Sequence, residues 1–137
     1  LSAPYAIRDA RLFLLPILTK LVGCWPKRGK IHSSPVLNTG YDCYPLKGVW
    51  ECLRLLRQVR RNLSRIHSPL LVIHGTGDRR VRVNDSYKIA GKSGTDDKKL
   101  LLLEDNRHTL LQSESKENVI EKIAGFVDLH SRIQVGE

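Results

Sequence analysis

The sequence has 137 residues, of which 41% are hydrophobic and 27% are charged, a balance typical of one soluble globular domain. It contains no apolar run of the ~20 residues that a transmembrane helix needs. The net charge of +9 comes from residues 1–68, which contain 12 Lys and Arg against 3 Asp and Glu, whereas residues 69–137 contain 11 of each sign. This contrast predicts a boundary near Ser68 and Pro69.

The basic segment opens with a short apolar stretch and an amphipathic helix. Residues 1–4 are like the end of a strand that leaves a core. Between Arg8 and Val22, apolar residues recur at the spacing of one helix face, and Pro16 is expected to kink this helix. The apolar residues are Leu12, Leu15, Leu18, Leu21 and Val22. They either pack on the core or line a pocket for an acyl chain.

A second helix is predicted after an irregular connection over residues 23–44, which are rich in Gly, Pro, Ser and Asn. Pro45 suits the first turn of this helix, which extends over roughly 18 residues and ends before Ser68. Its arginines lie mainly on faces other than the apolar one. They are either solvated or in transient contact with an anionic membrane surface. Because no aromatic residues alternate with them, we expect no binding of nucleic acid.

Two buried strands are predicted in the second segment. Residues 69–74 form a short, nearly continuous apolar run, which is typical of a strand buried on both faces of a parallel sheet. Residues 100–103 form a second run of this kind. Between them we predict a turn at residues 75–78 and a helix over residues 85–90 that Asn84 caps.

A last helix is predicted over residues 114–130. Its inner face is expected to consist of Val119, Ile120, Ile123, Phe126 and Val127. The order strand, helix, strand, helix predicts an α/β sheet. Two strands alone leave both edges and much apolar surface exposed, so we expect this segment to dock onto more sheet. The absence of Met from the sequence favours the same interpretation, a chain that continues upstream.

Two titratable residues follow the predicted strands, where the catalytic groups of open α/β sheets lie. Asp78 comes four residues after the first strand, and His108 lies in the loop after the second. An Asp that accepts a hydrogen bond from one ring nitrogen of a His fixes its tautomer. It also stabilises the imidazolium that forms when the His takes a proton from a nucleophile. The pattern therefore predicts the orienting acid and the general base of a hydrolase.

Each of these residues has a simpler explanation when it is taken alone. A Gly-Asp pair after a strand, as at Asp78, often forms only a turn. A loop histidine such as His108 is often a solvated surface residue. Asp105 is a second candidate for the acid, but it lies in the same loop as the histidine. His67 and His74 flank the first strand and are expected to be structural. The placement of an Asp and a His after two successive buried strands favours the catalytic interpretation.

The segment Pro69–Val81, with the sequence PLLVIHGTGDRRV, resembles the segment that carries the acid in α/β-hydrolases of the monoacylglycerol lipase and carboxylesterase group, which have serine aminopeptidase S33-type domains. Residues 100–108 resemble the strand and loop that carry their histidine. The resemblance implies the C-terminal part of an α/β-hydrolase parallel sheet, with its last two strands and flanking helices, plus a small helical cap. The end of a core strand, the cap and the core segment would be residues 1–4, 5–68 and 69–137.

The nucleophile that this resemblance implies is missing from the sequence. The family order is Ser, Asp, His, with the serine in a Gly-x-Ser-x-Gly elbow. No such elbow occurs here, and Ser93, in Gly-Lys-Ser-Gly, has the wrong spacing and follows the acid. We therefore expect the nucleophile and the oxyanion hole to lie outside this chain.

By resemblance, the chain is part of a serine ester hydrolase that acts on a small carboxylic ester or an acylglycerol. Asp78 and His108 would be catalytic, and Leu12, Leu15 and Leu18 would bind the substrate. No cofactor or metal is expected, since the three cysteines form no CxxC pair. Their odd number argues against a disulfide framework and favours the reducing cytoplasm. The alternatives are an inactive truncated fragment or interaction protein, and a peptidase or haloalkane-type activity on the same fold.

Overall fold

The computed structural model describes residues 2–26, 42–104 and 106–133, which divide into two compact units. The core unit combines Leu1–Ala6 with Val59–Glu137, and the small unit is Ile7–Gln58. Within the described ranges, no helix is long and apolar enough to cross a membrane.

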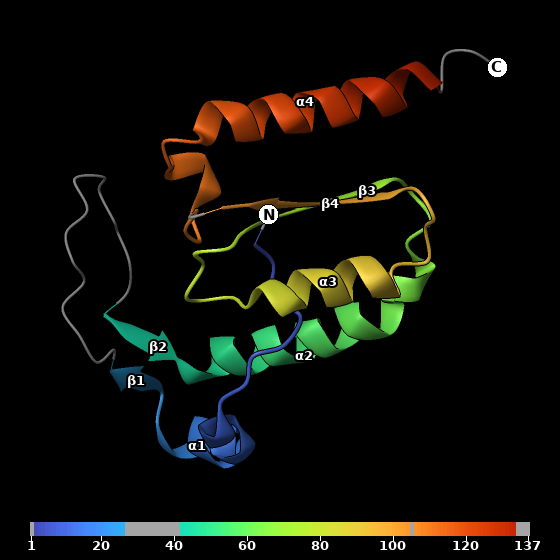
Figure 1. Cartoon of the computed structure of the whole chain (residues 1–137). Coiled ribbons are helices and arrows are strands. Elements are labelled where there is room, and N and C mark those ends of the chain that lie inside the picture. The colour runs from blue at the N-terminus through green and yellow to red at the C-terminus, as the bar shows by residue number, and fades with distance from the viewer. Residues whose placement is uncertain (1, 27–41, 105, 134–137) are drawn as a thin grey trace. The chain divides into compact units, whose positions relative to one another are not determined.

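The core unit is built on two parallel strands, β3 (Leu70–Gly75) and β4 (Lys98–Leu103), which pair along their whole length. The connecting helix α3 (Val83–Lys92) lies on one face of the sheet, and α4 (Lys116–Ile133) lies on the other (Figure 1). The predicted order of strand, helix, strand, helix is confirmed. It is the arrangement expected when each apolar strand is covered on both faces.

The start of α3 differs from the prediction that Asn84 caps it. Arg82 occupies the N-cap with extended backbone angles (φ −76°, ψ 138°), and its carbonyl accepts a hydrogen bond from Asp85 N–H at 2.8 Å. Asn84 therefore lies inside the first turn, where its side chain cannot take the capping position. The buried carboxylate of Asp85 accepts a hydrogen bond from Tyr5 N–H at 3.1 Å, which ties the N-terminal residues to α3.

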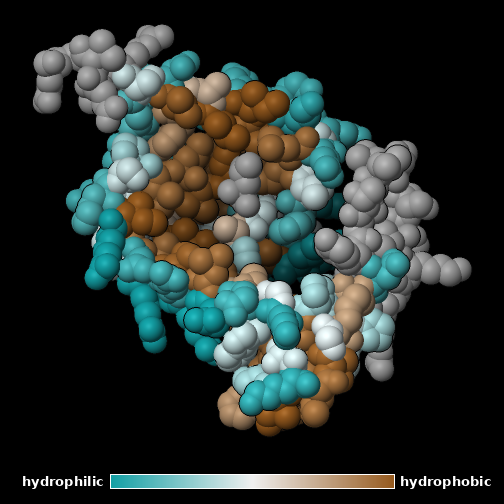
Figure 2. Space-filling view, turned by 180° about the vertical axis from the view of Figure 1, so that it is seen from behind, coloured by the Kyte–Doolittle hydropathy of each residue, from teal (hydrophilic) through white to brown (hydrophobic). Residues whose placement is uncertain are grey.

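Ile73, Leu110 and Val119 form the buried apolar cluster of the core unit, with Leu110 in a short 3-10 helix, η3 (Leu110–Gln112). The predicted inner face of α4 is only partly correct. Val119 is buried, but Ile120 and Val127 are 46% and 55% exposed. The apolar stripe of α4 is wider than the strands beneath it can cover, and Figure 2 shows apolar surface gathered around this helix and the sheet.

The second edge of β3 is contacted by the start of the chain. Ser2 N–H donates to Ile73 C=O at 2.9 Å, on the side of β3 that β4 does not occupy. Ser2 has a positive φ of 42° and is buried, and its hydroxyl has no hydrogen-bond partner among the described residues. The N-terminal residues thus run beside the sheet, where an unpaired edge needs cover.

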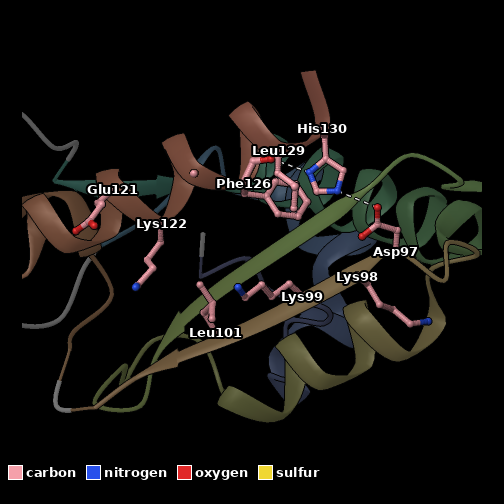
Figure 3. Close-up of a pocket in the computed structure, with 10 residues that line it drawn as sticks. Asp97, Lys98, Lys99, Leu101, Glu121, Lys122, Phe126, Leu129 and His130 are labelled. Carbon is pink, nitrogen blue, oxygen red and sulfur yellow. Dashed lines mark hydrogen bonds and ion pairs between the residues drawn. The ribbon is translucent and has the colours of Figure 1, made fainter. Parts of the chain in front are cut away.

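The C-terminal part of α4 is held by a histidine–aspartate pair (Figure 3). His130 Nδ1 donates to Phe126 C=O at 2.6 Å, and Nε2 donates to the Asp97 carboxylate at 2.8 Å. Two acceptors on one ring favour the doubly protonated imidazolium. The Phe126 carbonyl, and after it the Asp97 carboxylate, therefore raise the pKa of His130 above its ordinary value of 6.5.

This raised pKa predicts a stability that depends on pH. The pair stabilises the folded core unit fully below pH ~6.5, and the contribution is lost as the pH rises through the folded pKa. We expect the urea midpoint, followed by far-UV circular dichroism, to fall between pH 6 and pH 8. His130→Ala should remove that part of the decrease. An equally steep decrease in the variant would contradict the assignment.

The small unit begins with a 3-10 turn, η1 (Ala10–Leu14), which continues into α1 (Leu15–Leu21). Pro16 was expected to kink one continuous helix, but it lies in the first turn of α1. A proline is tolerated there because the first N–H groups of a helix have no acceptor within the helix. Leu15 is buried, whereas Leu21 and Val22 are 77% and 41% exposed, so the predicted apolar face ends before them.

The connection predicted to be irregular contains a short antiparallel pair, β1 (Cys24–Pro26) and β2 (Cys43–Pro45). The predicted second helix is confirmed as α2 (Leu46–Asn62), which is followed by η2 (Leu63–Arg65). Pro45 was expected in its first turn but is the last residue of β2, directly before the helix. A disulfide links Cys24 to Cys43, against the expectation from the odd number of cysteines. An odd number requires only that one cysteine remains, and Cys52 is free and exposed.

Breaking the disulfide is expected to destabilise the small unit. The bond closes a loop with a sequence separation of 19, for which chain entropy predicts a contribution of about 3 kcal/mol. Trp25 and Trp50 both lie in this unit, so tryptophan fluorescence reports on it. Cys24→Ser or dithiothreitol should lower the midpoint, and Cys52→Ser should leave it unchanged. A midpoint that is insensitive to reduction would contradict the expectation.

Candidate functional site

The carboxyl end of β3 leads into the loop that carries Asp78. Asp78 N–H donates to Gly75 C=O at 3.1 Å, which closes a tight turn directly after the strand. The Oδ1 atom of Asp78 then accepts hydrogen bonds from Arg80 N–H at 2.8 Å and from Val81 N–H at 3.0 Å. The carboxylate is therefore fixed by the backbone of its own loop. This fixed acid loop is residues 76–82.

The loop after β4 brings His108 to this carboxylate. His108 Nδ1 lies 2.8 Å from Asp78 Oδ2, across 30 residues of sequence. The side chain of Asp78 is completely buried, whereas that of His108 is 36% exposed. Because a carboxylate can only accept a hydrogen bond, Nδ1 carries the proton. The lone pair on Nε2 is then available to accept a proton from a nucleophile. The structure thus brings together the two residues that the sequence pattern selected.

The hydrogen bonds to Asp78 determine its charge state. Burial by itself raises the pKa of Asp78, but the hydrogen bonds from Val81 N–H, from His108 and from Arg80 N–H together outweigh burial. The pKa of Asp78 therefore lies below its ordinary value, and the carboxylate is ionised at neutral pH. An ionised acid is what a neighbouring histidine needs if it is to become an imidazolium during a reaction.

Gly75 allows the two loops to approach each other. A Cβ on this residue would lie 2.2 Å from the carbonyl oxygen of Asn106, two residues before His108. No real Cβ sits so close to a backbone atom. The sequence pattern marked Gly75 only as part of a turn, although its place between a buried strand and the acid is the signal for this close approach.

His74 was expected from the sequence to be structural, and its ring is fully buried. The sequence did not indicate its contacts, which are with the acid loop and with α3. His74 Nε2 lies 3.2 Å from Val81 C=O and 3.7 Å from Asp78 Oδ2, and Nδ1 is hydrogen-bonded to Ser86 Oγ. Its position four residues before the acid, at the end of the strand, was the available signal.

The other candidate residues lie apart from this pair or outside the described residues. Ser93 follows α3, and its hydroxyl donates to Ala90 C=O at 2.7 Å, a helix-ending contact rather than a reactive position. Asp105, the second candidate for the acid, is outside the described residues. Within residues 2–26, 42–104 and 106–133, no group of three or more His, Cys, Asp or Glu side chains could hold a metal ion.

The small unit contains a mainly apolar cavity of about 550 Å³. It is lined by Ile7, Asp9, Arg11, Leu12, Leu15, Leu18, Trp25, Pro26, Tyr44, Leu46 and Val49. The three leucines proposed from the sequence as substrate-binding residues are therefore among its walls. Asp9 is its only acidic residue, and it accepts hydrogen bonds from the Arg11 guanidinium at 2.6 Å and 2.9 Å, which lower the pKa of Asp9 to about 2.

A second cavity, of about 500 Å³, lies between β4 and α4 (Figure 3). Its lining includes Lys98, Lys99, Lys122 and the pair formed by His130 and Asp97. Asp97, Lys98 and Lys99 are at the amino end of β4, whereas His108 follows its carboxyl end. Catalytic groups of α/β sheets gather at the carboxyl ends of strands, so this cavity is not the candidate active site.

Comparison with known proteins gives the family. The family model described as serine aminopeptidase, S33 matches residues 42–116, more than half of the chain. No curated protein gives a significant match. Among solved structures, the chain is similar to one reported for the metagenome-derived lipolytic enzymes LipS and LipT, with a TM-score of 0.80 and 22% identity. This match covers 94% of this chain and 53% of that one.

A second similar structure is the monoacylglycerol lipase of Paleococcus ferrophilus, with a TM-score of 0.70 and 14% identity. That match covers 93% of this chain and 55% of the lipase. The chain therefore spans about half the length of the solved structures it matches. The family match and the shared fold together show that this chain belongs to the serine aminopeptidase S33 family of α/β-hydrolases.

Proposed function

We propose that this chain supplies the acid and the general base of a serine ester hydrolase. The observation that carries the proposal is the hydrogen bond of 2.8 Å from His108 Nδ1 to the buried carboxylate of Asp78, at the carboxyl ends of two parallel strands. The nucleophilic serine would lie outside the 137 residues, which contain no Gly-x-Ser-x-Gly. The complete protein would then be this chain joined to the polypeptide that carries that serine.

The pair would work in two half-reactions. His108 Nε2 takes the proton of the serine hydroxyl as the serine attacks the ester carbonyl, and then gives this proton to the leaving alcohol. The acyl group stays on the serine until water attacks, with His108 again as base, and the carboxylic acid is released. Asp78 holds the ring and stabilises its positive charge in both steps.

The substrate we propose is an ester with an apolar acyl group, such as an acylglycerol. The cavity of the small unit has apolar walls that suit such a group, among them Leu12, Leu15 and Leu18. An aminopeptidase must instead bind a protonated α-amine with an acidic group. Asp9, the only acid in the cavity wall, already accepts hydrogen bonds from Arg11. The solved structures with this fold include lipolytic enzymes, which supports the same choice.

We further propose the division of labour that the family resemblance implies. Residues 1–4 would end a core strand, residues 5–68 would form the cap, and residues 69–137 would form the core segment. In this scheme the small unit provides specificity and the core unit provides chemistry.

This proposal is tested by assaying the complete protein with p-nitrophenyl esters of increasing acyl length and with aminoacyl p-nitroanilides. We expect ester hydrolysis and labelling of one serine by a fluorophosphonate. Leu15→Trp, which fills the cavity, should shift the preference towards shorter acyl groups. The exposed Leu21→Trp is the matched control and should leave the preference unchanged. Preferential cleavage of the anilides would favour a peptidase instead.

The isolated chain is expected to behave differently. Without the nucleophile there is no covalent route, so the 137-residue chain should show no turnover of esters above background. This behaviour is that of the alternative in which the chain by itself is an inactive fragment. The lack of a Gly-x-Ser-x-Gly motif in the 137 residues favours that alternative for the isolated chain. Turnover by the isolated chain, after removal of contaminating esterases, would contradict both the alternative and the proposed source of the serine.

A further inference from the structure

His74 has the environment of a residue that holds other groups in place. It lies next to the last residue of β3, and its ring has no exposed surface. Each ring nitrogen has a partner, Ser86 Oγ at Nδ1 and Val81 C=O, 3.2 Å away, at Nε2. Polar side chains that are buried this completely are costly unless all their hydrogen bonds are made.

The partners of His74 decide where its proton lies. A carbonyl oxygen can only accept, so Nε2 carries the proton and donates to Val81 C=O. Nδ1 is then the acceptor for the Ser86 hydroxyl. Both ring nitrogens are then satisfied, Nε2 as a donor and Nδ1 as an acceptor.

Val81 connects His74 to the acid. Its N–H donates to Asp78 Oδ1 at 3.0 Å, and its C=O accepts from His74. The two groups lie in the successive peptide planes that meet at Val81 Cα, so the bond from His74 holds one of these planes and the bond to Asp78 holds the other. The Nε2 atom of His74 also lies 3.7 Å from Asp78 Oδ2, the oxygen that binds His108. Ser86 anchors the other side of the ring to α3 and is itself completely buried.

We propose that His74 is the positioning residue of the acid loop. Through Val81 C=O it holds residues 78–81 in the conformation in which Asp78 accepts the Nδ1 proton of His108. The inference rests on the proposed function, because it assigns His74 a role towards that pair. If His74 only filled the core, a ring of similar size without the Nε2–H would serve equally well. The positioning role, by contrast, requires the Nε2–H donor.

Four variants of the 137-residue chain separate donation from packing. His74→Phe keeps an aromatic ring but removes both nitrogens. His74→Gln keeps an N–H at about the distance of Nε2 from the backbone. Ser86→Ala removes the hydroxyl that orients the ring. His67→Phe, at an exposed histidine before the same strand, is the matched control.

The readouts are folding by circular dichroism and two NMR measurements. With histidine labelled by ¹⁵N, the exchange of the His108 Nδ1 proton with water reports the strength of its hydrogen bond. The titration of the ¹³C-labelled Asp78 carboxyl reports how well that carboxylate is held. Neither of these quantities should move in a folded variant if His74 only fills space.

We expect His74→Phe to speed the exchange of the His108 Nδ1 proton by about tenfold, as for the loss of one buried hydrogen bond, and to raise the midpoint of the Asp78 titration. His74→Gln should bring the exchange rate and the Asp78 midpoint most of the way back to their wild-type values. Ser86→Ala should give values between those of the wild-type chain and His74→Phe. A folded His74→Phe that matches His67→Phe would overturn the proposal. If His74→Phe does not fold, an Nδ1 exchange rate and an Asp78 midpoint in Ser86→Ala that match the wild-type chain would overturn it.

The same measurements distinguish this inference from the proposed function. If the wild-type chain shows no protected Nδ1 proton on His108, the acid–histidine pair itself is wrong. The effect of His74→Phe on the Asp78 midpoint would still test whether His74 holds the acid loop. If the wild-type proton is protected and every variant leaves it unchanged, only the role of His74 is wrong.

Discussion

Asp78→Asn is expected to lower kcat for ester hydrolysis by the complete protein by about four orders of magnitude. In the structure the Asp78 carboxylate accepts the Nδ1 proton of His108, which leaves the Nε2 lone pair free to act as the base. An Asn side chain can donate its amide N–H to Nδ1 instead. This stabilises the tautomer with the proton on Nε2, and the base is lost. His108→Ala removes the base outright and should cost as much.

The chain offers a matched control for this experiment. Asp97 and His130 form a second pair, also at 2.8 Å, but at the amino end of β4. Asp97→Asn and His130→Ala should change stability and leave kcat close to that of the wild-type protein, when each variant is assayed below its unfolding transition. Equal losses of kcat in both pairs would contradict the assignment of the active pair. So would hydrolysis that survives Asp78→Asn and His108→Ala.

The elements of the core unit could be predicted because their signals are local. The apolar runs that become β3 and β4 are short and bounded by Pro, Gly or charged residues, which is enough to separate strands from helices. Asp78 and His108 could be selected because parallel strands place the loops at their carboxyl ends side by side. The register of β3 and β4 then brings the two side chains to within hydrogen-bond distance.

The features that could not be predicted depend on contacts between distant residues. No local pattern shows that Cys24 pairs with Cys43, because the strands that align them are only three residues long. The contact of His74 with Val81 depends on the path of the acid loop, which a run of Gly, Asp and Arg does not determine. The exposure of Ile120 was missed because a helical spacing identifies an apolar face without showing what lies opposite it.

Ile120 and Val127 are exposed apolar side chains of α4, in a chain that spans about half the length of the solved structures it matches. A helix that covers a sheet buries its apolar face over the width of that sheet, and the described sheet beneath α4 has two strands. Ser2 already occupies a position on the open edge of β3.

Gly75→Ala is the substitution expected to disturb both stability and activity most directly. The added Cβ would lie 2.2 Å from Asn106 C=O, and ordinary contacts begin at 3.4 Å, so the loop that carries His108 must move by about 1 Å or more. Overpacking of this kind costs up to about 3 kcal/mol of stability. A displacement of about 1 Å of a catalytic group can cost about 100-fold in kcat. We therefore expect a lower urea midpoint and a reduced kcat in the same variant.

Two other glycines separate these effects. Gly94→Ala brings a Cβ to 2.0 Å from Ser64 C=O, a clash of the same severity between η2 and the end of α3, so it should destabilise the core unit and spare kcat of the folded protein. Gly91→Ala meets no atom within 4 Å on α3 and should stabilise by up to about 1 kcal/mol. A loss of kcat in Gly94→Ala equal to that in Gly75→Ala would mean that stability alone limits activity. A loss confined to Gly75→Ala would mean that the close approach of the two loops is what aligns His108 with Asp78.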